Sequence, residues 1–140
     1  MSGLRVEALT GAALEAALDD VARLRIAVFR AFPYLYDGDA AYERRYLEPY
    51  RESAGAILVG AFDGARLVGA ATGTPLADHA GDFAEAFAGT GVDLSTVFYC
   101  AESVLLPEYR GQGIGHRFFD LREAHARRRG FARVAFCAVV

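Results

Sequence analysis

Three glycines alternate in the stretch Arg110-Gly111-Gln112-Gly113-Ile114-Gly115, directly before a segment with helical periodicity. Glycine at a helix start costs backbone entropy and adds nothing to a core, so this spacing indicates that something approaches the backbone closely. The first N–H groups of a helix have no intrahelical partner, and with the helix dipole they form an anion site. Arg110 adds a positive charge at the loop entrance. We therefore interpret the loop as a phosphate cradle; the alternative is a turn before a glycine-tolerant helix.

Two common phosphate-binding motifs do not fit this loop. The dinucleotide fingerprint needs G-x-G-x-x-G and an acidic residue about 20 positions later, whereas this loop has G-x-G-x-G and the later segment "FARVAFC" contains no acid. The P-loop needs a lysine, and all 15 basic residues of this chain are arginines. Schiff-base chemistry on a lysine is excluded for the same reason.

The longer run "ESVLLPEYRGQGIGHRFF", from Glu102 to Phe119, resembles the motif of the GNAT superfamily of N-acetyltransferases. That motif is [Q/R]-x-x-G-x-[G/A] after an apolar strand that ends in proline. The order of elements from Leu4 to Val140 agrees as well. The resemblance implies an enzyme that transfers acetyl from acetyl-CoA to a primary amine, on a small molecule or a peptide N-terminus, by direct attack and without a metal. The alternative is a non-catalytic acyl-CoA-binding or interaction module.

The resemblance also implies where CoA binds. Backbone amides of the glycine loop would hold the pyrophosphate, and the backbone of the preceding strand would pair with the pantetheine arm as if it were a strand. The residues implied are Ser103, Val104, Leu105, Arg110, Gly111, Gln112, Gly113, Ile114, Gly115 and His116.

Glu102 is the candidate general base, because apart from Tyr99 it is the only ionisable side chain in the apolar run from Thr96 to Leu106. A carboxylate there needs a partner, so the alternatives are a salt bridge to an arginine or a position facing water, with deprotonation through water. Tyr99 is the candidate proton donor to the leaving thiolate, since the family's usual tyrosine lies on a later helix that this chain lacks. Direct attack makes Cys100 unnecessary as a nucleophile.

The acceptor amine is expected near the first two helices. Tyr34, Tyr36, Asp37 and Asp39 are candidates to hold a cationic amine, although Asp39 also suits a helix N-cap. A set of tyrosines at i, i+4 and i+8 is interpreted as a packing face. These are Tyr42, Tyr46 and Tyr50.

These residues must be positioned by an α/β fold, which we expect to be a GNAT-like mixed, mostly antiparallel sheet flanked by helices in a single domain over residues 1–140. Alternation and apolar runs predict strands, and the 3.6-residue period predicts helices. The predicted strands are Leu4–Thr10, Ala56–Asp63, Ala65–Leu76, Thr96–Leu106 and Ala132–Val140; the predicted helices are Ala13–Phe32, Ala40–Arg51 and Gly113–Arg129, with a short one over Asp82–Phe87.

The composition of the chain limits the kinds of partner that it is expected to bind. The net charge of −3 disfavours nucleic-acid binding. No apolar run approaches the ~20 residues of a membrane span, so a cytoplasmic protein is expected. The cysteines, Cys100 and Cys137, form no metal-binding motif. The chain ends at Val140, where the family usually continues through a helix and two strands. We therefore expect either a C-terminally truncated domain or pairing of the last strand with a second copy, as a homodimer.

Overall fold

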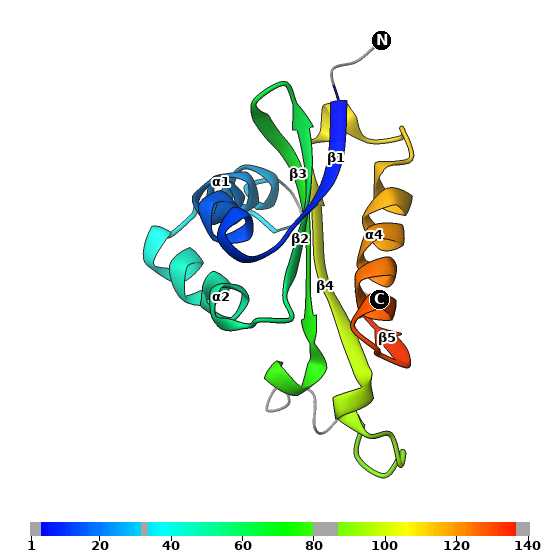
Figure 1. Ribbon diagram of the computed structural model, residues 1–140. Coiled ribbons are helices and arrows are strands. Elements are labelled where there is room, and N and C mark those ends of the chain that lie inside the picture. The colour runs from blue at the N-terminus through cyan, green and yellow to red at the C-terminus, as the bar shows by residue number, and fades with distance from the viewer. Residues whose placement is uncertain (1–3, 32–33, 80–86, 137–140) are drawn as a thin grey trace.

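The centre of the molecule is a five-stranded sheet whose strands follow one another in chain order, β1-β2-β3-β4-β5 (Figure 1). The structure is a computed structural model that describes residues 4–31, 34–79 and 87–136. Neighbouring strands are antiparallel except β4 and β5, which run parallel and are joined through a helix. The strands are β1 (Leu4–Leu9), β2 (Ile57–Asp63), β3 (Arg66–Pro75), β4 (Val97–Leu105) and β5 (Arg133–Ala135).

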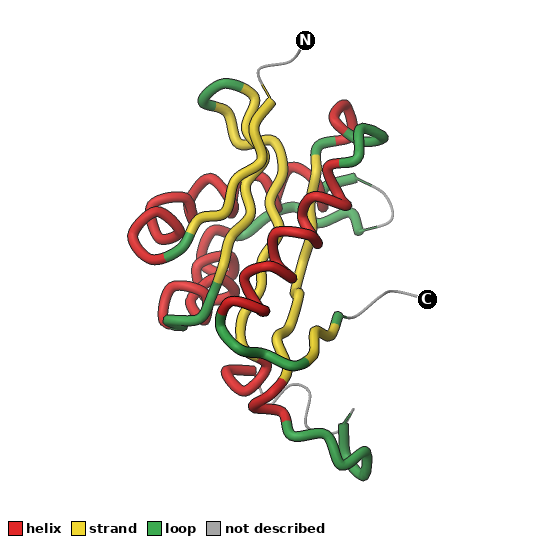
Figure 2. The backbone as a smooth tube through the Cα atoms, turned by 45° about the vertical axis from the view of Figure 1, so that its right-hand side comes forward, coloured by secondary structure: helices red, strands yellow, loops and turns green. Residues whose placement is uncertain are grey.

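Helices cover both faces of this sheet in the described part of the chain (Figures 1 and 2). Helices α1 (Gly11–Phe29) and α2 (Ala40–Glu52) lie on one face, and α4 (Ile114–Arg128) lies on the other. The apolar period that predicted the first helix is the face that α1 buries. Its buried residues include Leu14, Leu18, Val21 and Leu24.

The sheet therefore separates two hydrophobic cores. The core under α1 and α2 contains Leu14, Leu18, Val21, Leu24, Leu47, Tyr50, Ala56, Leu58, Leu67, Ala70 and Val104. The core under α4 contains Ile57, Val59, Ala61, Val68, Ala71, Phe98, Cys100, Ile114, Phe118 and Ala126. Phe98 and Cys100 of β4 belong to the core under α4, whereas Val104, an even number of residues further on, belongs to the core under α1 and α2, so the two-residue alternation of the strand is broken between Cys100 and Val104.

The predicted mixed, mostly antiparallel sheet is confirmed, with shifts of a few residues at the ends of elements. The first helix begins two residues earlier than predicted and ends at Phe29. The short helix predicted over Asp82–Phe87 falls almost entirely outside the described residues. Of the predicted last strand, the described part forms β5 and residues 137–140, with Cys137, lie outside.

A β-bulge interrupts the pairing of β3 with β4 at the place that matters most for the site. Ala71 pairs with Ser103, but Gly73 pairs with Cys100, so Thr72 faces two residues, Ala101 and Glu102. An extra residue in one strand shifts the alternation of all side chains beyond it. Ala101 packs in the core under α1 and α2, and the bulge lets Glu102 point to that same side.

Candidate functional site

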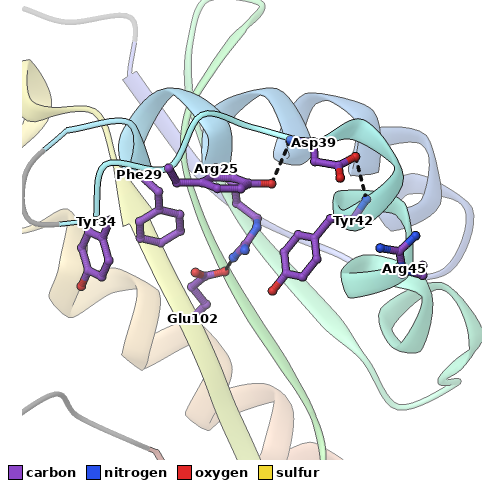
Figure 3. A pocket seen from close by; sticks show the side chains of 8 residues that line it. Arg25, Phe29, Tyr34, Asp39, Tyr42, Arg45 and Glu102 are labelled. Carbon is purple, nitrogen blue, oxygen red and sulfur yellow. Dashed lines mark hydrogen bonds and ion pairs between the residues drawn. The ribbon is translucent and has the colours of Figure 1, made fainter.

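A pocket of about 530 Å³ opens between the ends of α1 and α2 on the face where Glu102 emerges (Figure 3). Its walls come from α1, from the segment that leads into α2, from α2 itself and from β4. The lining residues are Arg25, Phe29, Tyr34, Tyr36, Asp39, Tyr42, Arg45 and Glu102. The structure thus brings four of the sequence candidates together, Tyr34, Tyr36, Asp39 and Glu102, while Asp37 is not among the lining residues.

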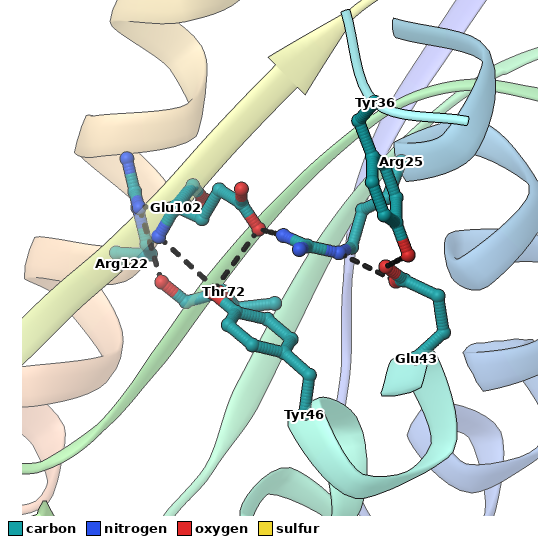
Figure 4. A network of polar contacts seen from close by, with 7 residues as sticks. All are labelled: Arg25, Tyr36, Glu43, Tyr46, Thr72, Glu102 and Arg122. Atoms are coloured by element: carbon teal, nitrogen blue, oxygen red, sulfur yellow. Dashed lines mark hydrogen bonds and ion pairs between the residues drawn. The ribbon is translucent and has the colours of Figure 1, made fainter. Parts of the chain in front are cut away.

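Glu102 is held in a network of polar contacts rather than standing alone in an apolar strand (Figure 4). Its Oε2 atom accepts hydrogen bonds from Nη1 of Arg25 and from the hydroxyl of Tyr46, the latter at 3.2 Å. Its second oxygen, Oε1, has no partner among the described residues, and the side chain is 22% exposed. The salt bridge that the sequence left as an alternative is therefore present, and one carboxylate oxygen still remains for the pocket.

Arg25 joins Glu102 to a second carboxylate, Glu43 of α2. Arg25 Nε donates to Glu43 Oε1 at 2.6 Å, and Tyr36 donates its hydroxyl proton to Glu43 Oε2 at 3.1 Å. Glu43 is fully buried and the side chain of Arg25 is 7% exposed. Two carboxylates thus share one guanidinium, which leaves one negative charge beside the pocket.

Arg25 and Glu43 were not identified from the sequence as site residues. Each stands at a helical position that belongs to a buried face: Arg25 lies four residues after Val21, and Glu43 lies four residues before Leu47. A charged residue at such a position needs a buried partner. That mismatch between charge and helical face is the signal that could have found them.

The tyrosine row of α2 is only partly the packing face that its spacing predicted. Successive rings contact one another, with centroids 6.3 Å apart for Tyr42 and Tyr46 and 6.4 Å apart for Tyr46 and Tyr50. Tyr50 is buried in the core, whereas Tyr42 lines the pocket and the hydroxyl of Tyr46 reaches Glu102. Burial raises the pKa of Tyr46 while the nearby Arg25 opposes the rise, so Tyr46 remains a proton-bearing donor.

Asp39 is confirmed as the N-cap of α2. Its Oδ1 accepts from the backbone N–H groups of Ala41 at 2.9 Å and Tyr42 at 3.3 Å. The hydroxyl of Tyr36 accepts from the N–H of Asp39 at 3.0 Å, which fixes Tyr36 between the cap and Glu43. Helix capping and the shape of the pocket wall therefore depend on the same few residues.

On the other face of the sheet, a buried arginine of α4 holds the bulge (Figure 4). Arg122, 1% exposed, donates from Nη1 to the carbonyls of Thr72 at 3.1 Å and Glu102 at 3.4 Å, and from Nη2 to Ser103 Oγ at 2.9 Å. The backbone N–H of Glu102 donates to Thr72 Oγ1 at 3.3 Å. Burial lowers the pKa of the Arg122 guanidinium. Arg122, which the sequence did not single out, thus fixes the backbone from which Glu102 projects.

The glycine loop enters α4 with two of its glycines in the left-handed region. Gly111 and Gly113 have φ values of +79° and +80°, which glycine adopts far more readily than other residues. Gly113 is the N-cap of α4 and provides no side-chain hydrogen bond to the helix start. A Cβ on Gly115 would meet nothing within 4 Å, and its φ is not positive. No neighbour in the described structure therefore requires glycine at 115, whereas a ligand approaching the first turn would.

The remaining loop residues lie on the surface around this helix start. Gln112 and His116 are exposed, and Ile114 is buried as the first apolar anchor of α4. Arg110 is exposed and donates from Nε to the carbonyl of Leu105 at 3.2 Å, which ties the loop back to the end of β4. The guanidinium therefore stands at the junction of strand and loop.

The strand edge that leads to the loop is open in the part of the chain that the structure describes. β5 pairs only with Val97, Phe98 and Tyr99. Ser103, Val104 and Leu105 pair with β3 on their other edge. An extended ligand with amide groups can pair with such an edge, and the residues present fit the pantetheine arm expected there.

Tyr99 and Cys100 lie on opposite faces of β4. Cys100 packs in the core under α4, away from the pocket, and burial raises the pKa of its thiol. A buried thiol with a raised pKa is a poor nucleophile. Tyr99 lies between Phe98 and Cys100, which both pack in the core under α4, so alternation places it on the opposite face of the sheet. It is not among the residues that line the pocket.

Three features follow one another along β4: a carboxylate in a pocket, an open strand edge, and a glycine loop suited to bind phosphate. Among the described residues, no group of three or more His, Cys, Asp or Glu side chains is arranged to hold a metal ion. Within those same ranges, no helix has both the length and the apolar character needed to cross a membrane. The arrangement can bind an anionic chain with an extended arm and present its end to a basic carboxylate.

Comparison with known proteins gives a family match over most of the chain. Residues 18–140 match the model of the acetyltransferase (GNAT) family. The comparison with curated protein sequences returns no match.

Solved structures resemble this fold at low sequence identity. An aminoglycoside N-acetyltransferase, AAC(6')-Iy, in complex with CoA has a TM-score of 0.70 and 14% identity, over 99% of this chain and 79% of that chain. The aminoglycoside 6'-N-acetyltransferase AAC(6')-Ih from Acinetobacter baumannii has a TM-score of 0.65 and 17% identity, over 98% and 80%. A ribosomal-protein-alanine N-acetyltransferase from Brucella melitensis biovar Abortus 2308 has a TM-score of 0.60 and 16% identity, over 97% and 80%.

Proposed function

Because the chain belongs to the acetyltransferase (GNAT) family, we propose that it is an N-acetyltransferase that uses acetyl-CoA and acetylates a primary amine bound in the pocket beside Glu102. The observation that carries this proposal is the position of the Glu102 carboxylate. It projects into the pocket from the strand whose open edge leads to the glycine loop. When bound, acetyl-CoA supplies the thioester carbonyl that the amine attacks and the thiolate that leaves.

Acetyl-CoA, the acetyl donor, is bound mainly by backbone groups and by one charged side chain. Backbone amides from Arg110 to His116 would hold the pyrophosphate, and the side chain of Arg110 would add a positive charge beside it. Main-chain groups of Ser103, Val104 and Leu105 pair with the pantetheine arm. Since these contacts come from the backbone, they depend on the conformation of loop and strand more than on side-chain identity.

Glu102 acts on the acceptor. An amine is protonated near neutral pH and attacks only after it loses a proton. The free Oε1 of Glu102 receives that proton, directly or through water, while Oε2 stays bonded to Arg25 and Tyr46. Tyr99, on the same face of β4, is our candidate donor of a proton to the leaving thiolate.

The test is an acetyl-transfer assay that detects the released thiol, with calorimetry of CoA binding beside it. Glu102→Gln should lower kcat by about 10²–10⁴-fold with little change in CoA affinity, because general-base catalysis contributes about that much. Glu7→Gln is the matched control, since Glu7 is an exposed carboxylate with its own arginine partner, Arg5.

Two outcomes would contradict the proposal in different ways. Full activity of a folded Glu102→Gln variant would show that Glu102 has only a structural role, as the partner of Arg25 in a salt bridge. Tight CoA binding without acetylation of any amine in a broad panel would favour an acyl-CoA-binding module instead of an enzyme.

A further inference from the structure

The pocket beside Glu102 has an aromatic end and a charged end (Figure 3). Phe29 and Tyr34 contact edge to face, with ring centroids 4.9 Å apart and an angle of 71° between planes. Tyr34 is 58% exposed and Tyr42 is 44% exposed, so large ring surfaces face the opening. Arg45 lies on the far side from Tyr34, with Glu102 between them in this view.

The backbone next to the aromatic end is strained at one residue, Leu35. Leu35, between two tyrosines that line the pocket, has a φ of +50° and leaves its side chain 64% exposed. A leucine in the left-handed region costs about 1–2 kcal/mol. The turn is fixed by hydrogen bonds from the N–H groups of Leu35 to the carbonyl of Ala31 and of Tyr36 to that of Phe29. These hydrogen bonds hold the backbone of Leu35 and Tyr36, next to the aromatic end of the pocket.

The charged groups around the pocket carry one net negative charge, which a single positive charge on the acceptor would neutralise. Two guanidinium groups, of Arg25 and Arg45, face the carboxylates of Asp39, Glu102 and Glu43, the last lying directly behind Arg25. Arg25 is paired with both Glu43 and Glu102. Arg45 is exposed and has no partner among the described residues. A second ammonium group on the acceptor would therefore meet the guanidinium of Arg45, with only the helix-capping carboxylate of Asp39 near it (Figure 3).

We infer that the acceptor is a small amine with a single positive charge on an aromatic or other apolar body. This inference rests on the proposed function and names its substrate class. The ammonium group lies at Glu102, and the apolar body lies against Phe29 and Tyr34. Aromatic faces also attract the ammonium group itself. Arg45 repels polycationic amines such as aminoglycosides and tolerates an anionic group at the far end.

The experiment compares two probe amines, 2-phenylethylamine as the monocation with an aromatic body and sisomicin as the polycation. For the unmodified chain, kcat/KM should be at least about tenfold higher for 2-phenylethylamine. Arg45→Glu should shift the ratio toward sisomicin by about tenfold, since one repulsive charge becomes attractive. Arg44→Glu is the matched control, because Arg44 is the adjacent exposed arginine of α2 and does not line the pocket. It should leave the ratio unchanged.

Binding of both amines is also measured by calorimetry, in the presence of CoA, so that the inference does not depend on turnover. If neither amine is acetylated, the proposed function is in doubt, but the ratio of the two dissociation constants still tests the acceptor class. Preference for sisomicin in the unmodified chain would overturn the inference while leaving an N-acetyltransferase intact. An equal shift in Arg44→Glu would overturn the role of Arg45.

Discussion

Arg122 offers the sharpest test of how the fold positions the site. Its guanidinium bonds to the carbonyls of Thr72 and Glu102 and to Ser103 Oγ, all at the bulge. Arg122→Met keeps most of the side-chain volume. It removes every side-chain donor and the cation–π contact with Phe119, whose ring centroid lies 4.5 Å from the guanidinium carbon. The change therefore removes the polar contacts of Arg122 while it largely preserves the packing.

The size of the effect follows from the groups left behind. A buried acceptor that loses its partner costs about 1–3 kcal/mol, and three carbonyls, of Thr72, Glu102 and Phe118, lose a hydrogen bond from Arg122 in this variant. Part of this loss of stability is offset, because the variant no longer has to desolvate a buried guanidinium. We expect the free energy of unfolding to fall by about 2–4 kcal/mol. In a domain of this size that lowers Tm by about 10 °C.

Two measurements separate stability from positioning. Urea unfolding of Arg122→Met and of Arg117→Met, an exposed arginine on the same helix, gives the stability difference. Steady-state kinetics well below Tm should then show a lower kcat, because the backbone of Glu102 is no longer fixed, with a nearly unchanged KM for acetyl-CoA. Arg122→Lys should fall between the two, since an ammonium group cannot span the same acceptors. Unchanged stability and unchanged kcat in Arg122→Met would refute the reasoning.

Two further predictions concern the glycine loop and a buried histidine. Gly113→Val forces a β-branched residue to a φ of +80° and should weaken CoA binding more than about tenfold, or about 1.4 kcal/mol. Gly89→Val, at a φ of +76° in the loop that precedes β4 at the opposite end of the molecule (Figure 1), should leave CoA affinity unchanged in calorimetry. Burial lowers the pKa of His125, and the hydrogen bond between its Nε2 and the Gly55 carbonyl at 2.8 Å only partly offsets this. The unfolded chain therefore binds more protons, so stability should fall as pH drops below about 6.5. His125→Gln should flatten this dependence in urea unfolding at pH 5.5 and 7.5, and an identical slope in both proteins would contradict the assignment.

The features that local sequence determines could be predicted. Alternating glycines at a helix start indicate a backbone conformation that few other residues adopt, and Gly111 and Gly113 adopt it. Asp39 before a helical pattern indicates a cap, and Asp39 caps α2. In both cases the physical cause lies within a few residues of chain.

The features that depend on pairing between distant segments could not be predicted in the same way. Simple alternation along β4 would place Glu102 on the same face as Cys100, toward α4. The bulge opposite Thr72 reverses this, and it depends on the register of two strands. Likewise, the sequence contains Arg25 and Glu43 on buried helical faces, but nothing local says that they meet Glu102. Glu102 could therefore be identified as the candidate base from its place in an apolar strand. Its orientation and its partners could be learned only from the three-dimensional structure.

The sharing of Arg25 between Glu43 and Glu102 has a consequence for chimeras made from relatives. Arg25 and Glu43 lie in one contiguous block of chain, from α1 to α2, whereas Glu102 lies on β4. Exchanging that block to change the acceptor would replace both members together and leave Glu102 behind. Unless the donor block carries a cation at the position of Arg25, a partly buried carboxylate would lose its counter-charge, which is among the more destabilising changes a protein interior can undergo. Any such graft must therefore treat α1, α2 and residue 102 as one unit.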